Sequence, residues 1–268
     1  MHAYLGSIWS CRFFWLSLVQ MDLRSRYRGS VLGMGWSLVQ PIAMTTILCV
    51  VFKVVFGIEL RVYAPYVFAG MTFWGYFTSV LVQGCGCFFQ GEAYIRQYPA
   101  PMAIYPLRTV LGSGIHFFIG LCMAVLLSLG TGPADKDMSR LFQLLALPSL
   151  LPTFVLLFLL GWSVAILFGI LHVRFRDTKH LAEIGLQGLF YMLPIMFPPE
   201  RLEQGGRLIL VFRYNPLTPF FDLLREPICY GHIPSLMTYT FAASVVLVLC
   251  ITAILALKID ERQLIFHL

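Results

Sequence analysis

Residues 153–171 form a run without a single charged side chain. A helix needs about 20 apolar residues to cross a bilayer, and in lipid only a helix or a closed barrel satisfies its own backbone. Charged residues make up 12% of the chain, against about a quarter in soluble domains. The sequence therefore predicts an all-α membrane protein with six transmembrane helices, at residues 32–56, 66–89, 105–129, 148–172, 181–198 and 236–257.

The segment before the first run predicts a helix that lies in the membrane interface, within residues 1–30. The apolar stretch at 8–19 is too short to cross a bilayer, and Ser10, Ser17, Gln20 and Arg24 would form a polar stripe along it. A secretory signal peptide fits less well, because the charges follow the apolar run and no small-residue cleavage site appears before the next span.

The basic side chains indicate the orientation. Arg24, Arg26 and Arg28 directly precede the first span and mark a cytoplasmic membrane edge. An even number of spans then places both termini in the cytoplasm, with residues 258–268 as a cytoplasmic tail. The membrane explains the net charge of +6, so we expect no nucleic-acid partner.

Residues 90–104, between the second and third spans, contain charged, aromatic and apolar side chains where a polar loop would suffice. A short helix at 92–97 can form before Pro99 and Pro101 stop it. The segment is either a docking surface, with Tyr94, Ile95 and Tyr98 exposed, or an amphipathic elbow on the lipid. Its candidate docking residues are Glu92, Tyr94, Ile95, Arg96, Gln97 and Tyr98.

Two further loops carry candidate residues. In the inner loop after the fourth span, Arg174 and Arg176 are either positive-inside markers or partners for lipid phosphate. Asp177 or Thr178 is placed to cap the fifth span. Outside, residues 199–234 are too long for a turn and too broken by proline to span. They predict short re-entrant external helices, one of them at residues 220–228.

The sequence contains no recognisable catalytic or metal-binding motif. No glycine is followed by lysine, which excludes a phosphate-binding P-loop, and Cys85 and Cys87 have no second pair to complete a metal site. The spans carry almost no ionisable residues, with Lys53 and Arg108 close enough to span ends to snorkel. We expect a transporter subunit without a cofactor or metal of its own, which takes its energy from another protein.

Aromatic residues gather near the outer halves of the first, second and fifth spans. Flat apolar rings suit the sliding of sugar rings, although interfacial anchoring accounts for many aromatic residues in membrane proteins. The candidate channel aromatics are Phe52, Phe56, Trp74, Phe77, Phe190, Tyr191 and Phe197.

Five motifs in order along the chain carry a family resemblance. They are residues 22–33 with Trp36 and Pro41, and the sequences at 105–108, 174–177, 193–196 and 215–218. Together they make the chain similar to the polysaccharide-exporting ABC-2 permeases over essentially its whole length. The resemblance implies a single transmembrane domain over 1–268 with a six-span core at 31–257, in a bacterial cytoplasmic (inner) membrane.

The resemblance also implies partners and roles. The family forms homodimers joined to two copies of an ATPase subunit, which binds ATP and Mg, and it exports a lipid-linked polysaccharide of the O-antigen, capsule or teichoic acid type. By position, residues 8–28 match the interface helix, 92–97 the coupling helix and 199–234 the external gate, while spans one and five match the channel walls. On the interface helix, Arg24, Arg26 and Arg28 are the candidate residues that attract the diphosphate of the cargo. Two alternatives stay open: an ABC-2 permease for a drug or lipid, and a membrane enzyme acting on polyprenyl-linked substrates.

Overall fold

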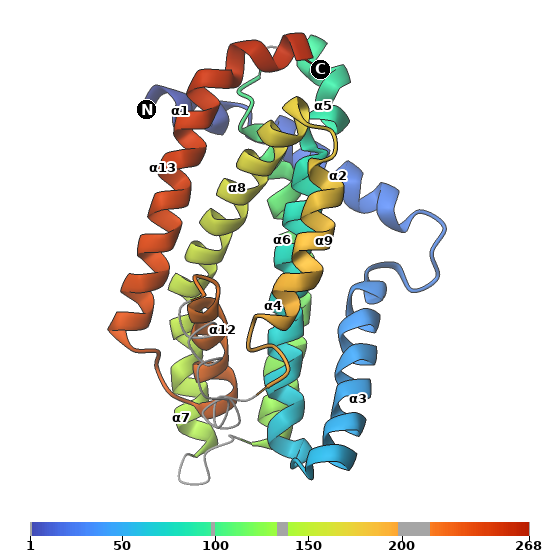
Figure 1. Cartoon of the computed structure of the whole chain (residues 1–268), viewed down its shortest axis with the longest axis vertical. Helices are drawn as coiled ribbons and strands as arrows, with labels where there is room; N and C mark the ends of the chain where they lie inside the picture. The colour runs from blue at the N-terminus through green and yellow to red at the C-terminus, as the bar shows by residue number, and fades with distance from the viewer. Residues whose placement is uncertain (1, 98–99, 133–138, 198–214, 268) are drawn as a thin grey trace.

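The computed structural model describes residues 2–97, 100–132, 139–197 and 215–267. In these residues every regular element is helical, and five long helices run along the length of the molecule (Figure 1). They are α3 (Trp36–Phe56), α4 (Leu60–Cys85), α6 (Ile104–Thr131), α8 (Leu150–Arg174) and α13 (Leu236–His267). The predicted all-α fold is confirmed.

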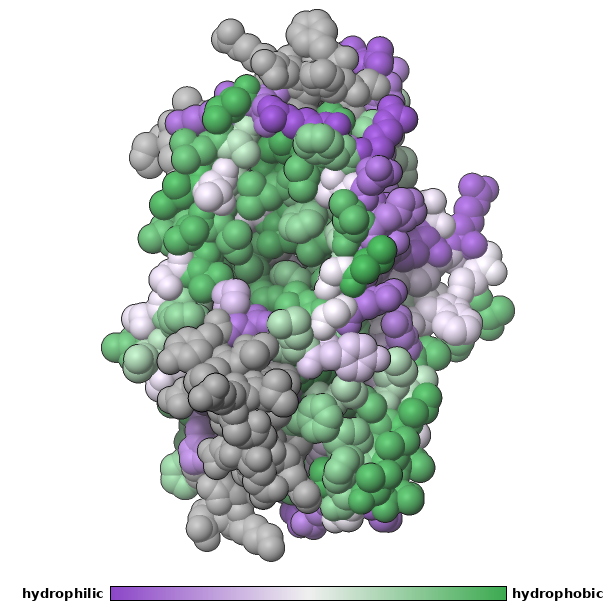
Figure 2. Space-filling view, in the orientation of Figure 1, coloured by the Kyte–Doolittle hydropathy of each residue, from purple (hydrophilic) through white to green (hydrophobic). Residues whose placement is uncertain are grey.

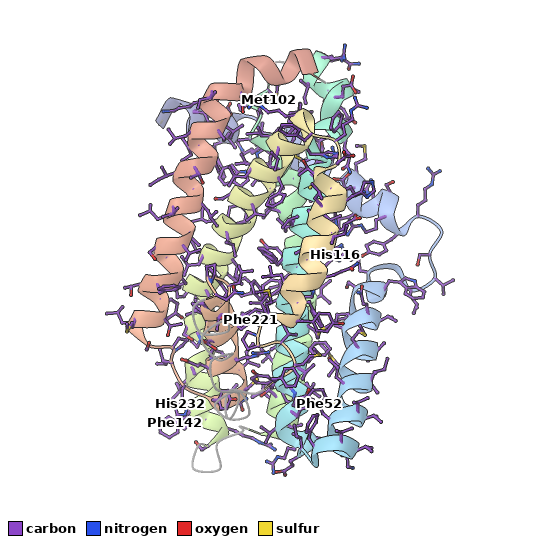
Figure 3. All side chains as sticks on the ribbon, in the orientation of Figure 1. Phe52, Met102, His116, Phe142, Phe221 and His232 are labelled. Carbon is purple, nitrogen blue, oxygen red and sulfur yellow. The ribbon has the colours of Figure 1, made fainter. Side chains whose placement is uncertain are left out.

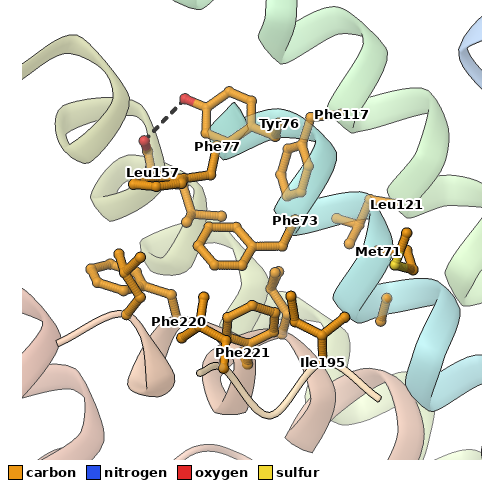
Figure 4. Close-up of a cluster of buried hydrophobic side chains, with 14 of the residues drawn as sticks. Met71, Phe73, Tyr76, Phe77, Phe117, Leu121, Leu157, Ile195, Phe220 and Phe221 are labelled. Atoms are coloured by element: carbon orange, nitrogen blue, oxygen red, sulfur yellow. Dashed lines mark hydrogen bonds between the residues drawn. The ribbon is translucent and has the colours of Figure 1, made fainter. Parts of the chain in front are cut away.

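Helix α4 lies at the centre of the bundle, where it packs against α3, α6, α8 and α9 (Thr178–Tyr191). Its Phe73 is fully buried, and Tyr76 donates a hydrogen bond of 3.0 Å to the Leu157 carbonyl of α8. Figure 4 shows Phe73 between Phe117 of α6 and the pair Phe220 and Phe221. The core therefore joins elements that are far apart in the sequence.

Within the described residues, four helical segments are long and apolar enough to cross a membrane, namely Gly33–Phe56, Ile104–Thr131, Arg140–Arg174 and Leu236–Asp260. The predicted second span begins earlier, at Leu60, and breaks at Gly86 into α4 and α5 (Cys87–Gln97). Helix α9 has 14 residues, or about 21 Å, against a hydrocarbon thickness of about 30 Å. The number of six spans stays a prediction.

The N-terminal segment forms two helices where we expected one. Helices α1 (His2–Ser10) and α2 (Arg12–Tyr27) are separated at Cys11. The predicted polar stripe of Ser10, Ser17, Gln20 and Arg24 is exposed, and Leu18 and Val19 are buried. Both chain ends and α5 lie at one end of the molecule, here called the inner end (Figure 1), where hydrophilic side chains are prominent (Figure 2).

The opposite end, called the outer end, carries short helices. Helix α7 (Arg140–Ala146) leads through η2 (Leu147–Ser149) into α8, and α12 (Thr218–Arg225) continues into the π-helical segment η4 (Glu226–Tyr230). Gly231 ends η4 with a φ of +74°, a conformation that favours glycine. A helix at 220–228 is thus confirmed, whereas residues 199–214 of the expected gate region lie outside the described residues.

Candidate functional site

An ion pair fixes α2 to the bundle. Nε and Nη2 of Arg108, on α6, both donate to the carboxylate of Asp22 on α2. The Arg108 side chain is 9% exposed, so it does not snorkel to the surface as we expected but stays buried with its counter-charge. A forked pair of this kind fixes the orientation of both partners.

Arg24, Arg26 and Arg28, the candidate diphosphate-binding residues, do not share one face, because residues two positions apart point to different faces of a helix. Arg24 and Arg28 are exposed, and their side chains have no hydrogen bond or ion pair with another described residue. Arg26 is exposed as well, but its side chain turns toward the bundle, where its Nη2 donates a 2.7 Å hydrogen bond to Oε1 of Gln83 on α4. The structure thus separates one inward arginine from two outward ones.

A cavity of about 540 Å³ lies beside Arg26, between the end of α2 and helices α3, α4 and α6. A second cavity of about 380 Å³, lined by Asp22, Gln83 and Arg108, adjoins it, since Arg26 and His116 line both. We call the two together the inner cavity. Figure 3 shows His116 on α6 beside α2, well separated from Phe52 near the far end of α3.

The wall of the inner cavity combines apolar surface with uncharged polar groups. Its charged residues are Arg26 and, in the smaller cavity, the paired Asp22 and Arg108. The Tyr27 hydroxyl lies 3.2 Å from Nε2 of His116, and the Ser79 and Ser113 hydroxyls lie 3.0 Å apart. Gln83 donates a 2.6 Å bond to Ser79 Oγ. Trp36 and Trp74 supply flat apolar faces in the same wall. Neutral hydrogen-bonding groups with aromatic faces suit a hydroxyl-rich ligand, and Arg26 suits an anionic group on it.

The seven candidate channel aromatics fall into two groups. Phe52 packs against Phe56 at 5.1 Å and Phe197 at 5.6 Å between ring centroids, toward the outer end. Trp74 packs against Phe77 at 6.1 Å and Phe190 at 5.7 Å, and Phe190 against Tyr191 at 5.4 Å. Only Trp74 lines the inner cavity. Through Phe190 it links that cavity to α9.

The candidate coupling residues lie on α5, which is longer than expected. Ile95 is 8% exposed and Tyr94 is half-buried against Phe14 of α2, with ring centroids 5.9 Å apart. Their expected exposure is therefore wrong. The exposed face carries Arg96 and Gln97, and Arg96 pairs with Glu92 at 2.8 Å. Tyr98 lies outside the described residues.

Helix α5 packs closely on α6. A Cβ atom at Gly91 would lie 2.3 Å from the Tyr105 ring, so position 91 has room for glycine alone. Because α5 contacts both α6, through Gly91, and α2, through Tyr94, a displacement of α5 would reach two of the helices that line the inner cavity.

The predicted loop residues after α8 have structural contacts. Arg174 forms an ion pair with Asp260 of α13, and the guanidinium of Arg176 lies 5.6 Å from the ring centroid of Phe89. Asp177 is the residue before α9 but makes no capping hydrogen bond through its side chain. Contacts within the protein therefore account for the positions of both arginines, and no lipid phosphate is needed to explain them.

Several cavity residues escaped the sequence analysis. Ser79 and Gln83 are four residues apart on α4, and Ser113 and His116 are three apart on α6. Each spacing places two polar side chains on one face of an otherwise apolar helix. That signal was present in the sequence, but the meeting of the two faces depends on how α4 packs against α6.

Comparison with known proteins adds a family assignment. The family described as ABC-2 type transporter matches residues 14–229. The chain belongs to this family. It is 26% identical over 211 residues to an O-antigen export system permease protein, RfbA, of Klebsiella pneumoniae, covering 78% of this chain and 77% of that one.

Two other relatives extend the picture of this ABC-2 family member. The RfbA protein of Myxococcus xanthus is 24% identical, with 81% of this chain and 80% of the relative aligned. The polysialic acid transport protein KpsM of Escherichia coli is 21% identical, with 87% of each chain aligned. The inner cavity is formed largely within the family match, and its helices are those of a multi-pass membrane protein.

Proposed function

We propose that the chain is the transmembrane subunit of an ABC transporter that exports a lipid-linked polysaccharide of the O-antigen, capsule or teichoic acid type. The inner cavity carries this proposal, because it combines an inward arginine with uncharged hydrogen-bonding groups and two tryptophans in a partly apolar wall. The guanidinium of Arg26 would attract the diphosphate of the lipid carrier, and the wall would receive the first sugars. The names of the relatives support a polysaccharide cargo.

The proposed assembly is a homodimer of six-span subunits, joined to two copies of an ATPase subunit that binds ATP and Mg, in the cytoplasmic membrane with both termini inside. Helix α3 supports a dimer, since it packs only on one side of the bundle and Val54 and Val55 are 79% and 64% exposed. An exposed apolar helix is covered by lipid or by another protein. The passage would run between α3 of one subunit and α9 of the other.

The conformational change of the ATPase subunit would reach this chain through α5. The exposed Arg96 and Gln97 would lie in a cleft of the ATPase subunit, and closure of that subunit on ATP would push α5 toward the membrane. The contacts Gly91–Tyr105 and Tyr94–Phe14 would carry the push to α6 and α2. These helices would then shift the walls of the inner cavity and move the glycan into the passage.

Reconstitution of the chain with its ATPase subunit tests the cargo. A polyprenyl-diphosphate-linked glycan should stimulate ATP hydrolysis, and Arg26→Gln should raise the concentration for half-maximal stimulation about tenfold, as for loss of a hydrogen bond between charged groups. The double change Arg24→Gln with Arg28→Gln should have a smaller effect that disappears at high salt. Arg140→Gln, an exposed arginine at the outer end, is the matched control.

Two outcomes would contradict this account. Absence of stimulation by any polyprenyl-linked glycan, with stimulation by a drug or free lipid, would assign a different cargo. Equal loss of basal and stimulated hydrolysis in Arg26→Gln would give Arg26 a role in folding or docking.

The docking surface is tested by co-purification with the ATPase subunit. Arg96→Glu should reduce the recovered ATPase several-fold, because it reverses an exposed charge at the proposed contact. Arg140→Glu makes the same reversal at the outer end and should leave recovery unchanged. Undiminished recovery with Arg96→Glu would remove α5 from the interface.

A further inference from the structure

Helix α12 is buried although it lies in the expected external gate region. Its Phe220, Phe221 and Leu223 are fully buried, and it packs against α4, α8 and α13. Phe221 meets Phe73 of α4 edge to face at 4.7 Å between ring centroids, and Figure 4 shows Ile195 beside the same cluster. The outer end of the core is thus closed by α12 and by the segment that follows α9.

Arg225, the last residue of α12, is a buried cation held by neutral partners. Its side chain donates through Nε to the Tyr66 carbonyl at 3.2 Å, through Nη1 to the Pro194 carbonyl at 2.6 Å and through Nη2 to the Ile195 carbonyl at 3.0 Å. The guanidinium carbon lies 3.6 Å from the centroid of the Tyr66 ring. Within the described chain no carboxylate lies at ion-pair distance from it.

These contacts supply hydrogen-bond donors to the carbonyls of an irregular backbone segment. Residues 194–197 follow α9 and are not helical, so their carbonyls have no helical partners. Besides Arg225, the Tyr63 hydroxyl donates to the Met196 carbonyl at 2.8 Å and the Tyr66 hydroxyl to the Phe197 carbonyl at 3.0 Å. Each carbonyl from 194 to 197 therefore receives a side-chain donor. We call Arg225, Tyr63 and Tyr66 with these four carbonyls the outer latch.

The other end of the α12–η4 unit is fixed separately. Ser128 of α6 donates to the Ile228 carbonyl at 2.6 Å, and Gln143 of α7 donates to the same oxygen at 2.5 Å. Because α12 is anchored to α6 and α7, release of the outer latch would free the 194–197 segment and α9 and leave α12 in place. Helix α9 packs on α4 and α8 and exposes Leu181 and Ile184.

We propose that Arg225 is a positioning residue that holds the segment after α9 in the closed arrangement of the passage, so that transport requires release of the outer latch. This inference rests on the proposed function, in which α9 forms a wall of that passage. The guanidinium suits the role because its planar fork binds several carbonyls at once, whereas a lysine ammonium presents a single point of charge. The contacts that tie Arg225 to the segment include two hydrogen bonds to backbone carbonyls, which can break and re-form.

Gly70 provides a second way to disturb the latch. A Cβ atom at position 70 of α4 would lie 2.4 Å from Nη2 of Arg225, so Gly70→Ala would displace one arm of the guanidinium without removing it. Gly114 of α6 is the matched control, since a Cβ atom there would have no neighbour within 4 Å.

The test measures leakage through the complex of this chain with its ATPase subunit in vesicles loaded with a small labelled oligosaccharide. Without ATP, Arg225→Lys and Gly70→Ala should each raise efflux about tenfold, as expected when a charge-assisted hydrogen bond that stabilises the closed state is lost. Gly114→Ala should behave as the native complex. Thermal unfolding temperature and basal ATP hydrolysis are measured on the same vesicles, because a purely structural defect would change these and leave the closed passage tight.

The proposed role of the outer latch would be overturned if Arg225→Lys and Gly70→Ala fold, retain basal ATP hydrolysis and give vesicles as tight as native ones. If Arg225→Lys does not fold, Gly70→Ala decides. The leak assay uses neither the native cargo nor ATP. A native complex that fails to export glycolipid would therefore overturn the proposed function while the leak comparison still reports on the latch.

Discussion

The two ends of the molecule use arginine differently. At the inner end, Arg26 is exposed and has one hydrogen bond, to the flexible side chain of Gln83. At the outer end, Arg225 is 3% exposed and has three hydrogen bonds, all to backbone carbonyls. A guanidinium has five donors, so Arg26 keeps donors for a ligand, whereas Arg225 uses its donors to hold protein segments together. The number and kind of partners separate a binding arginine from a structural one.

The largest expected effect comes from a comparison of two neighbouring residues on α4. Phe73 lies in the closed outer core and Trp74 in the wall of the inner cavity. Phe73→Ala should lower the free energy of unfolding by about 3–5 kcal/mol, as for other buried phenylalanines. Trp74→Ala should cost less stability but reduce glycan-stimulated hydrolysis more. Thermal unfolding and ATPase assays measure both, and a larger stability loss for Trp74→Ala would abolish the distinction.

The next effect concerns the carboxylate that anchors α2. Asp22→Asn removes the counter-charge of buried Arg108 and should lower the free energy of unfolding by about 2 kcal/mol, a reduced value because Asp22 is 39% exposed. Release of α2 should also loosen the inner cavity. Increased protease cleavage near residue 28 at unchanged temperature would show this, and an unfolding temperature equal to the native one would show that the pair contributes nothing.

At the outer end, replacing a carboxylate is expected to change the free energy of unfolding in the opposite direction. Burial raises the pKa of Asp222 to about 6, and nearby Arg225 opposes this shift. The unfolded chain releases this proton near pH 4, so the free energy of unfolding falls as pH rises from about 4 to 6 and stays low above it. Asp222→Asn should remove that loss and stabilise the protein on the order of 2 kcal/mol at pH 7.5, with no gain at pH 4. Unfolding midpoints at both pH values measure it; destabilisation at pH 7.5 would contradict the sign.

The smallest effect is expected for the exposed pair on α5. Glu92→Gln breaks a surface pair four residues apart, which is worth about 0.3–0.5 kcal/mol. Stability should barely change, whereas co-purification with the ATPase subunit reports any role of Glu92 in docking. A stability loss comparable to that of Asp22→Asn would show that α5 belongs to the rigid core.

The sequence was sufficient for the helical class, because apolar runs of about 20 residues match the length of a membrane-spanning helix, whereas barrel strands are about half as long. It also located the exposed polar residues of α1 and α2 and the helix that covers residues 220–228. The expected exposure of Ile95 was wrong because the close approach of α5 to α6, which depends on Gly91, is a tertiary contact.

The two arginine sites show more clearly which features can be predicted from the sequence and which cannot. Helical spacing alone separates Arg26 from Arg24 and Arg28, so this division was accessible from the sequence. In the sequence, Arg225 is one more arginine of the external segment 199–234. Its hydrogen-bond acceptors on Tyr66 and Ile195 are backbone oxygens of residues distant in the chain. Backbone acceptors leave no side-chain signature, so no sequence pattern could have revealed them.

The most direct test of the central claim, that a glycolipid enters the inner cavity, is photo-crosslinking from within it. A photoreactive residue in place of Ser113 faces the cavity, and one in place of Leu126 lies on the same helix at a 65% exposed position outside it. In the complex with the ATPase subunit, irradiation with a polyprenyl-diphosphate-linked glycan should label position 113 and leave position 126 unlabelled. Equal labelling of both, or labelling at 126 alone, would contradict the account.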